Sequence, residues 1–263
     1  MTGTRDDRIA EERQISGFEK IEIHGIGRLT LRQGGEYSVV VHGRPDVVRR
    51  VITEANGGRL VIRQRPRICF AWHLYRHRTR SPEIRVTAPR LKAIRVSGAC
   101  SFVAEPLASP AMEISVSGAA QAALERIEAE RFRFSSSGAA KLDLASIEAT
   151  KVDVKLSGSG RIRVGKMHAS RASLTISGGG AVEAAGTADE FRVKASGAAS
   201  VRAATLETRE AAIHLSGSGK VAVWATESLD IRASGAAKVT YHGSPRISQH
   251  LSGAAAVHAA AGG

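Results

Sequence analysis

The sequence is poor in three features, and each shortage excludes a class of protein. Only 2 of the 263 residues are cysteine, too few for a disulfide-stapled scaffold. Aromatic residues make up 4% of the chain, and no apolar run approaches the roughly 18 residues that a membrane-spanning helix needs. The N-terminus, MTGTRDDRIAEERQ, has charged residues where a signal peptide has an apolar stretch, so we expect no signal peptide in the sequence as written.

The chain is rich in positive charge and contains a repeat. Lys and Arg number 38 against 25 Asp and Glu, a formal net charge of +13, and the hydrophobic content of 43% excludes a disordered chain. The dipeptide Ser-Gly recurs nine times, with its glycine at positions 98, 118, 138, 158, 178, 197, 217, 235 and 253. A spacing of 18 to 20 residues indicates a solenoid in which each repeat forms one rung.

Apolar and polar residues alternate on both sides of each Ser-Gly pair. The fourth residue after the glycine is apolar in all nine repeats, and the second residue before it is apolar in all but one, Ser136. The fourth residue before it is apolar except for Gln249. A period of two predicts a strand, a turn and a strand with one buried face, and it excludes helical repeats. We therefore predict an all-β fold, a right-handed parallel β-helix of about nine rungs of about 20 residues, stacked about 4.8 Å apart.

Residues 15–94 are predicted to form a β-rich region that caps the N-terminal end of the rod. Five alternating segments, KIEIHG, RLTLRQG, YSVVVHG, RLVIRQ and EIRVTAP, are bounded by Gly or Pro, and residues 45–54 are alternatively one short helix. Such a cap protects an exposed sheet edge. We expect residues 1–14 to be disordered or processed, 15–94 to form the cap and 95–260 to form the repeats, the last two as one continuous domain.

The order of several motifs is similar to that of a known family. The sequence has SGFxKIEI around Phe18, LTLRQG at 29–34 and VTAPxLxxI at 86–94, followed by the Ser-Gly repeats. Over residues 14–258 it resembles the bacterial family described as "putative auto-transporter adhesin, head GIN domain". The resemblance implies a β-helical domain of unknown function in the periplasm, on the outer surface or secreted, with no catalytic residues to carry over. The missing leader favours a cytoplasmic location instead.

Three groups of residues are candidates for metal binding, disulfide formation or catalysis, but the sequence favours a purely structural role for each. Cys69, His73 and His77 are spaced like metal ligands on a helix, but arginines surround them and repel a dication, so we predict no metal and no cofactor. We expect Cys69 and Cys100 to be separate thiols, with a bridge after export as the alternative. No serine beside a glycine lies in a nucleophile elbow and no pair of acids recurs at rung spacing, so we predict that the protein is not an enzyme.

Positive charge gathers along the Ser-Gly edge. The side chains three residues before and three residues after each glycine are expected to point outward, and these two columns hold eight Lys or Arg, two His and no Asp or Glu. We call the eight cations the basic ribbon: Arg95, Lys155, Lys194, Arg232, Lys141, Arg161, Lys220 and Lys238. Acids such as Glu128, Glu148 and Asp189 are expected in loops far from the corner. The ribbon either only keeps the rod soluble or binds anions.

A second basic segment lies between Glu54 and Glu83, where there is no acid. Its Arg76, Arg78 and Arg80 cluster with Trp72, a mixture typical of loops that bind phosphates or sugars through charge and stacking. The alternatives are a solvated insertion or a loop that packs its Trp onto the end of the rod.

These features favour a non-enzymatic, adhesin-like envelope or surface protein. Its basic ribbon is predicted to bind acidic polysaccharide or lipopolysaccharide through many weak charge contacts. The alternative is a cytoplasmic or periplasmic assembly module that forms homo-oligomers through β-helix ends, because the last rung near Val257 is an open edge. A polysaccharide-acting enzyme ranks lower, and nucleic-acid binding ranks last because no nucleic-acid fold signature is present.

Overall fold

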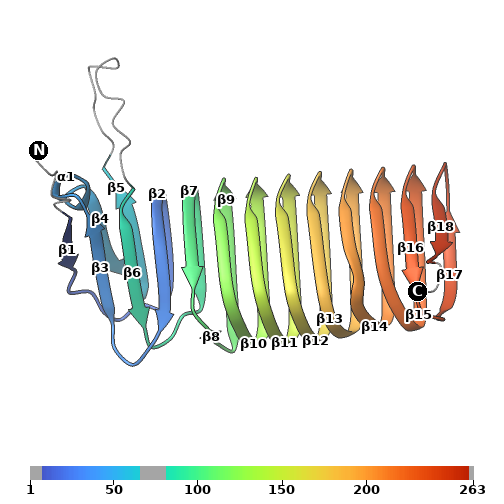
Figure 1. The fold of residues 1–263 in the computed structure, drawn as a ribbon, viewed down its shortest axis with the longest axis horizontal. Helices are drawn as coiled ribbons and strands as arrows, with labels where there is room; N and C mark the ends of the chain where they lie inside the picture. The colour runs from blue at the N-terminus through green and yellow to red at the C-terminus, as the bar shows by residue number, and fades with distance from the viewer. Residues whose placement is uncertain (1–7, 66–80, 261–263) are drawn as a thin grey trace, which may run out of the picture.

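The computed structural model describes residues 8–65 and 81–260, most of them in one 18-stranded sheet that winds into a parallel β-solenoid (Figure 1). The predicted all-β, parallel, rung-by-rung fold is confirmed. Eight stacked intervals separate the nine Ser-Gly corners, so the solenoid has about eight turns where the repeat count predicted about nine. Among the described residues, no helix has both the length and the apolarity to cross a membrane.

The N-terminal end of the rod is covered by strands that break the parallel pattern. The elements here are β1 (Ile9–Glu12), β2 (Lys20–Gln33), β3 (Ser38–Gly43), α1 (Pro45–Val48), β4 (Val51–Asn56), β5 (Arg59–Gln64) and β6 (Glu83–Ala88). Strand β3 pairs antiparallel with both β1 and β6, and β4 pairs antiparallel with β5. Strand β2 pairs parallel with β5 and β6 and with the first strand of the repeats.

The short helix of this region ends earlier than a single helix over residues 45–54 would. Helix α1 begins at Pro45, whose fixed φ and missing N–H suit the first helical turn, and it ends at Val48. From Val51 onward the chain is strand β4, because its β-branched residues pair across to β5.

The repeats form the rod itself. Their strands are β7 (Ala93–Ala104), β8 (Leu107–Ala108), β9 (Ala111–Gly118), β10 (Gln121–Gly138), β11 (Lys141–Gly158), β12 (Arg161–Gly178), β13 (Ala181–Gly197), β14 (Ser200–Gly217), β15 (Lys220–Gly235), β16 (Lys238–His242), β17 (Arg246–Leu251) and β18 (Ala256–Ala259). Strands β10 to β14 each bend around a whole rung, and consecutive rungs pair parallel and in register. The register shifts within the pairs β12–β13, β13–β14 and β14–β15, where it passes over one to three residues in one or both of the paired strands.

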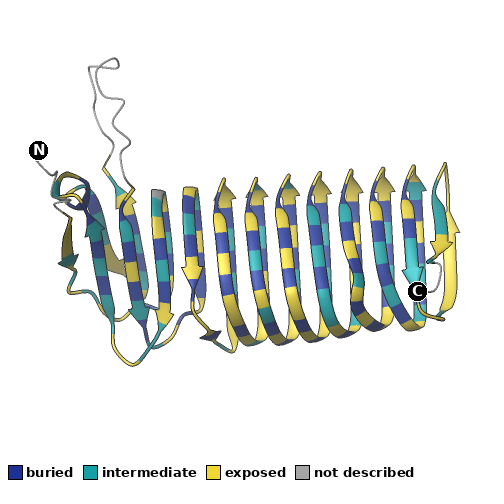
Figure 2. Cartoon of the chain, in the orientation of Figure 1, coloured by how far each residue is buried: buried dark blue, intermediate teal, exposed yellow. Residues whose placement is uncertain are grey.

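One thin apolar core runs along the rod. Buried and exposed residues alternate along most strands of the rod, as Figure 2 shows, whereas every residue of β17 is exposed. At the fourth position before the corner glycine, Ile114, Phe134, Val154 and Leu174 stack in succession, all at most 8% exposed. Branched aliphatic and small side chains fill most of this core, and phenylalanines such as Phe132 and Phe134 are buried in its N-terminal half.

Two features of the backbone, a positive φ and a close approach to the preceding rung, require glycine at the corners. At Gly118 the backbone has a φ of +116°, which favours glycine, and a Cβ there would be only 2.6 Å from the carbonyl oxygen of Gly98 in the rung below. The same close approach recurs up the stack, and it begins one rung earlier, where Gly98 lies over Gly25 of β2. The corner therefore fixes the register of every rung and, with it, the outward columns beside the corner.

Candidate functional site

The two columns beside the Ser-Gly corner stack residue on residue. In the pre-corner column the register pairs Arg95, Ser115, Ser135, Lys155, Thr175, Lys194, His214, Arg232 and His250 in succession. In the post-corner column it pairs Ser101, Gln121, Lys141, Arg161, Ala181, Ser200, Lys220, Lys238 and Ala256. All eight cations of the basic ribbon are exposed, so the register brings them together along one edge of the rod.

Most of the ribbon's charge is not neutralised by the protein. Within residues 8–65 and 81–260, only two of the eight cations have a carboxylate within 4.0 Å: Lys141 Nζ lies 3.1 Å from an oxygen of Asp143, and Arg232 Nε lies 3.7 Å from Asp230 Oδ2. Elsewhere on the rod several cations are closely paired, as in Arg209 with Glu227 at 2.8 Å. Six of the eight ribbon cations are therefore exposed without a neighbouring carboxylate among the described residues.

Like charges are also direct neighbours within the ribbon. Lys141 pairs with Arg161 on the next rung, and Lys220 pairs with Lys238, so each pair of Cα atoms is separated by about 4.8 Å. Like charges that face each other across neighbouring strands destabilise a sheet. An anion bound between them would relieve that repulsion.

A groove runs along the pre-corner side of the ribbon in the C-terminal half of the rod. We call it the serine groove; its volume is about 450 Å³ and it is lined by Thr175, Lys194, Ala195, Ser196, His214, Leu215, Ser216, Arg232, Ala233, Ser234, His250 and Ser252. The four serines come from four successive rungs, and none of their hydroxyls has a hydrogen-bond partner in the part of the chain that the structure describes. They are free to bond a ligand.

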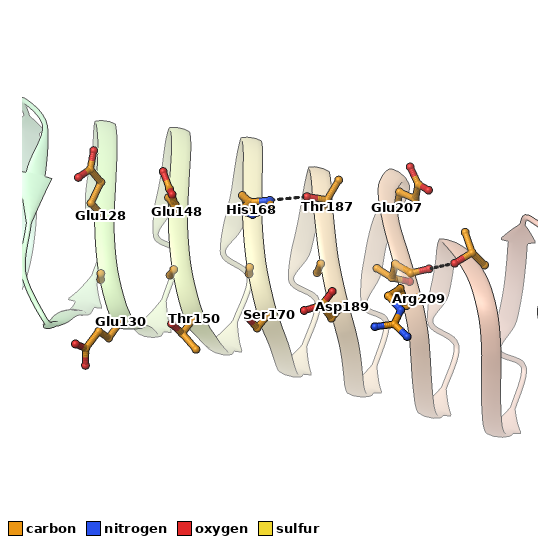
Figure 3. A pocket seen from close by; sticks show the side chains of 16 residues that line it. Glu128, Glu130, Glu148, Thr150, His168, Ser170, Thr187, Asp189, Glu207 and Arg209 are labelled. Atoms are coloured by element: carbon orange, nitrogen blue, oxygen red, sulfur yellow. Dashed lines mark hydrogen bonds between the residues drawn. The ribbon is translucent and has the colours of Figure 1, made fainter.

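A larger groove of about 760 Å³ lies about halfway around the rung from the corner (Figure 3). We call it the acidic groove. Small residues such as Ala169 and Ala188 form its floor, and Glu128, Glu148 and Asp189 stand on its rims. These acids were expected in loops, and that expectation is wrong, because strands β10 to β14 continue around the whole rung and carry them.

Several polar groups in and beside the acidic groove are paired within the protein. Arg126 lies 2.7 Å from Glu128, and His168 Nδ1 lies 2.8 Å from the hydroxyl of Thr187. The guanidinium of Arg209, which donates a hydrogen bond to Glu227, lowers the pKa of that carboxyl. Among the described residues, no group of three or more His, Cys, Asp or Glu is arranged to hold a metal ion.

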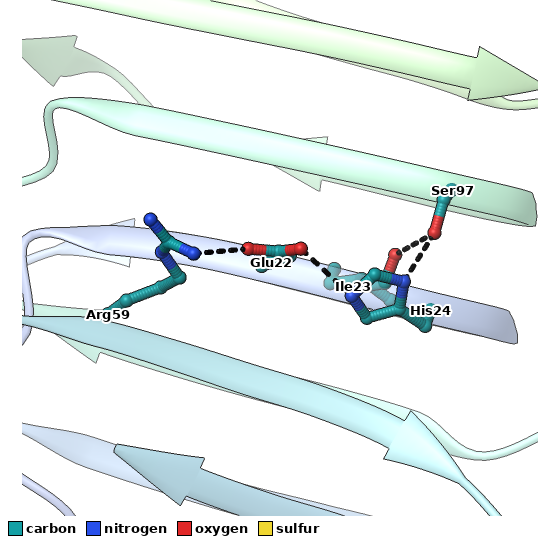
Figure 4. Close-up of polar contacts among 5 residues, drawn as sticks. All are labelled: Glu22, Ile23, His24, Arg59 and Ser97. Atoms are coloured by element: carbon teal, nitrogen blue, oxygen red, sulfur yellow. Dashed lines mark hydrogen bonds and ion pairs between the residues drawn. The ribbon is translucent and has the colours of Figure 1, made fainter. Parts of the chain in front are cut away.

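One hydrogen-bonded array at the start of the serine column resembles a catalytic arrangement. The hydroxyl of Ser97 lies 2.6 Å from His24 Nδ1, and His24 Nε2 lies 3.0 Å from Glu22 Oε1 (Figure 4). Arg59 holds the other carboxylate oxygen of Glu22 at 3.1 Å. The sequence interpretation missed this array, although the signal was present: His24-Gly25 occupies, one rung lower, the place of a Ser-Gly pair.

The array has the geometry of a clamp between β2, β5 and β7. The single proton of the Ser97 hydroxyl is shared with the carbonyl oxygen of Ile23, 3.2 Å away, which competes with the imidazole for it. A serine nucleophile gives that proton to the histidine. The array ties the first rungs together, and its residues lie outside both grooves described above.

Several predicted residues lie outside the described part of the chain. These are Trp72, Arg76, Arg78, Arg80, Cys69, His73 and His77. Cys100 is described: it is 3% exposed, and burial raises the pKa of its thiol to about 11.

The fold and its surfaces define a parallel β-solenoid whose charged groups lie in open columns and shallow grooves. The chain belongs to the family described as "Putative auto-transporter adhesin, head GIN domain", whose profile matches residues 17–146 and 134–245. The family resemblance carried by the sequence motifs is thus confirmed.

Solved structures share this fold over nearly the whole chain. A "putative adhesin" from Parabacteroides merdae is 18% identical, with 97% of this chain and 96% of that chain covered and a TM-score of 0.71. From Parabacteroides distasonis, a "putative lipid binding protein" is 22% identical with a TM-score of 0.68, and a "putative adhesin" is 18% identical with a TM-score of 0.67, each covering 97% of both chains. No curated protein matches the sequence. None of these names is that of an enzyme.

Proposed function

We propose that the protein is a non-enzymatic, adhesin-type contact protein of the cell envelope or surface, and that its basic ribbon binds acidic polysaccharide. The observation that carries this proposal is the in-register column of exposed cations, six of which have no carboxylate within 4.0 Å among the described residues. The stacking of these cations in two columns beside the corner gives a polymer several positive contacts along one edge of the rod.

The chemistry beside the ribbon favours a saccharide over the other polyanions. Serine hydroxyls line the groove next to the cations and match the hydroxyl groups of sugars. Proteins that bind single-stranded nucleic acid use aromatic side chains as stacking platforms, and the serine groove contains none. Lipopolysaccharide carries the same anionic saccharide chemistry, and one solved relative of this fold is titled a "putative lipid binding protein".

Binding of this kind is multivalent and sensitive to salt. One exposed ion pair contributes about 0.2–1 kcal/mol, so useful affinity requires several contacts along one polymer. The eight ribbon cations lie on rungs about 4.8 Å apart, a length of edge that a flexible polymer can follow. Raising the salt from roughly 0.01 M to 1 M shortens the Debye length from roughly 30 Å to 3 Å, so we expect binding to be lost over that range.

The test compares two triple variants in polymer binding. Lys155→Ser, Lys194→Ser and Arg232→Ser together remove three ribbon cations. The matched control Arg131→Ser, Lys166→Ser and Arg202→Ser removes three exposed cations from other faces, and none of these has an ion pair among the described residues.

Binding of the full chain to polygalacturonate, and to neutral dextran as a blank, is measured at low and high salt. We expect the ribbon variant to lose at least tenfold in affinity and the control to keep most of it. Equal losses in the two variants, or no binding by the unmodified protein at low salt, would refute the proposal. Lipopolysaccharide and its deacylated form are added as further ligands: preference for the acylated form assigns the recognition to lipid.

Self-association through the C-terminal end is the second candidate function. Among the described strands β17 pairs only with β15 and β18 only with β16, and Ile247 and Leu251 on β17 are 41% and 39% exposed. Against it, Gln249 replaces an apolar core residue above Ile231, and Arg246 adds charge to the edge strand. Light scattering over a concentration series decides: growth that Leu251→Lys abolishes supports association, and a persistent monomer excludes it.

A further inference from the structure

We propose that the serine groove is the main ligand site of the ribbon, that it takes an extended anionic polysaccharide lying parallel to the rod axis, and that protonation of His214 and His250 strengthens this binding. The inference rests on the proposed function, because it specifies where and how the ribbon binds acidic polysaccharide.

The direction of the ligand follows from how the groove is built. Equivalent positions of successive rungs line it, so its long axis is the axis of the rod. From Thr175 to His250 the cationic wall crosses four rung intervals, roughly 19 Å. A linear polymer lying along this direction meets a new serine hydroxyl and a new wall residue at every rung.

The two walls offer two kinds of contact. One wall carries the long side chains of Lys194 and Arg232, which suit the acidic groups of the polymer. The other carries Ser196, Ser216 and Ser234, whose hydroxyls donate and accept hydrogen bonds and suit sugar hydroxyls. Buried aliphatic residues form the floor between the walls, so no acid projects from it.

Histidines occupy the alternate rungs of the cationic wall. Lys194 and Arg232 stand two rungs apart, roughly 10 Å, with His214 between them and His250 beyond them. The permanent charges therefore repeat every second rung. When both imidazoles are protonated, the wall carries a cation on each of four consecutive rungs, and histidine is the side chain that changes charge between about pH 5 and pH 8.

The groups that face the two histidines are few. Lys194 on β13 and Arg232 on β15 flank His214, and Asp230 Oδ2 on β15 lies 4.0 Å from His214 Nε2. His250 on β17 faces Arg232. A polyanion in the groove places negative charge beside both imidazoles and so favours their protonated form. Linkage then requires that binding takes up protons, so binding tightens as the pH falls.

The experiment uses the full chain and dextran sulfate, whose sulfate groups stay ionised throughout, so any pH dependence belongs to the protein. Affinity is measured at low salt at about pH 5.5 and about pH 7.5, on either side of the range in which histidine titrates. Two added exposed charge contacts predict a gain of roughly tenfold at the lower pH. His214→Asn with His250→Asn should abolish that gain, so that the affinities of the variant at the two pH values are equal. His258→Asn, an exposed histidine on β18 outside the groove, is the matched control and should keep the gain.

A second pair of variants tests the site itself. Lys194→Ser with Arg232→Ser removes the permanent cations of the groove, and Lys220→Ser with Lys238→Ser removes the same charge from the post-corner column. We expect the first pair to reduce affinity at least fivefold more than the second. In addition, Asp230→Asn should raise affinity roughly twofold to fivefold, because its carboxylate competes with the ligand for Arg232.

The outcomes separate this inference from the proposed function. Absence of salt-sensitive binding at either pH overturns both. If binding is sensitive to salt but the variant Lys194→Ser with Arg232→Ser loses the same affinity as Lys220→Ser with Lys238→Ser, the ribbon remains the binding surface and the serine groove is not its main site. A pH gain that survives His214→Asn with His250→Asn overturns the role of the histidines. Affinity that does not rise with the length of sulfated oligosaccharides overturns the axial orientation.

Discussion

Replacing Gly178 with alanine tests whether the stacked corner glycines hold the rungs in register. Gly178 has a φ of +117°, and a Cβ there would be 2.9 Å from the carbonyl oxygen of Gly158 in the preceding rung. The next residue, Gly179, has no such φ, and its Cβ would meet nothing closer than the hydroxyl of Ser159 at 3.9 Å. Both glycines are exposed in the same turn, so Gly179→Ala is a matched control.

The two substitutions differ by a free energy that the geometry predicts. A side chain in this φ region costs about 1–3 kcal/mol. Contact with a backbone oxygen that cannot rotate away adds about 1–3 kcal/mol of overpacking. Gly178→Ala should therefore lower the free energy of unfolding by about 2–6 kcal/mol. Gly179→Ala should leave it unchanged or raise it by about 0.4–1 kcal/mol, because it restricts the unfolded chain.

Chemical denaturation followed by far-UV circular dichroism measures both variants against the unmodified protein. We expect a lower midpoint for Gly178→Ala alone, with an unchanged slope. If the two variants unfold at the same denaturant concentration, the corner does not require glycine. The stacking of corner on corner would then not be what fixes the register of the outward columns.

Other predictions follow from single side chains. Ser136→Ala should stabilise the protein by about 1 kcal/mol in the same assay, because the buried hydroxyl has no partner among the described residues. Thr208→Val should cost about 1–2 kcal/mol, because the buried hydroxyl donates a 2.7 Å hydrogen bond to a carbonyl of β15. Burial raises the pKa of the Cys100 thiol to about 11, so we expect this thiol to react with thiol reagents only when the protein unfolds, as peptide mapping would show. The stability that this raised pKa contributes is present below pH 9.0 and is lost as the pH rises toward 11. Lys220→Glu should raise the midpoint slightly by placing a carboxylate beside Lys238, and should weaken polyanion binding.

The fold could be predicted from the sequence because the Ser-Gly corner and the apolar residues around it recur in every repeat. Each Ser-Gly pair specifies a corner, and the apolar residues at fixed distances from it specify two buried faces. Those positions place Leu142, Ile162 and Val182 on one another, and the structure pairs them so. The exceptions also have physical meaning. Ser136 remains a buried hydroxyl in an interior rung, whereas Gln249 lies on β17, which pairs with β15 and with no other strand among the described residues.

The positions of surface residues could be predicted from the sequence only in the two columns beside the Ser-Gly corner. Positions three residues from the glycine keep their register in every rung, so the columns holding Lys194 and Lys220 followed from counting. Halfway around the rung the repeats differ in length, and the register shifts there by a residue or more. Counting from the corner therefore places Glu128 beside Glu148, but it could not show that Asp189 lines the same groove. Nor could it show that the imidazole of His24 takes the place of a serine in the first rung.

In-register stacking turns every surface charge into a neighbour of the charge on the next rung. At some positions outside the ribbon the sequence satisfies this constraint with opposite signs, as in Arg163 with Glu183, which form an ion pair between consecutive rungs. Like charges also meet outside the ribbon, where Arg131 pairs with Lys151, but there Asp153 lies 3.6 Å from Lys151 Nζ. Lys220 and Lys238 of the ribbon are like-charged neighbours, and neither has a carboxylate within 4.0 Å among the described residues. Under the proposed function, an anionic partner supplies the opposite charge that six of the eight ribbon cations lack among the described residues.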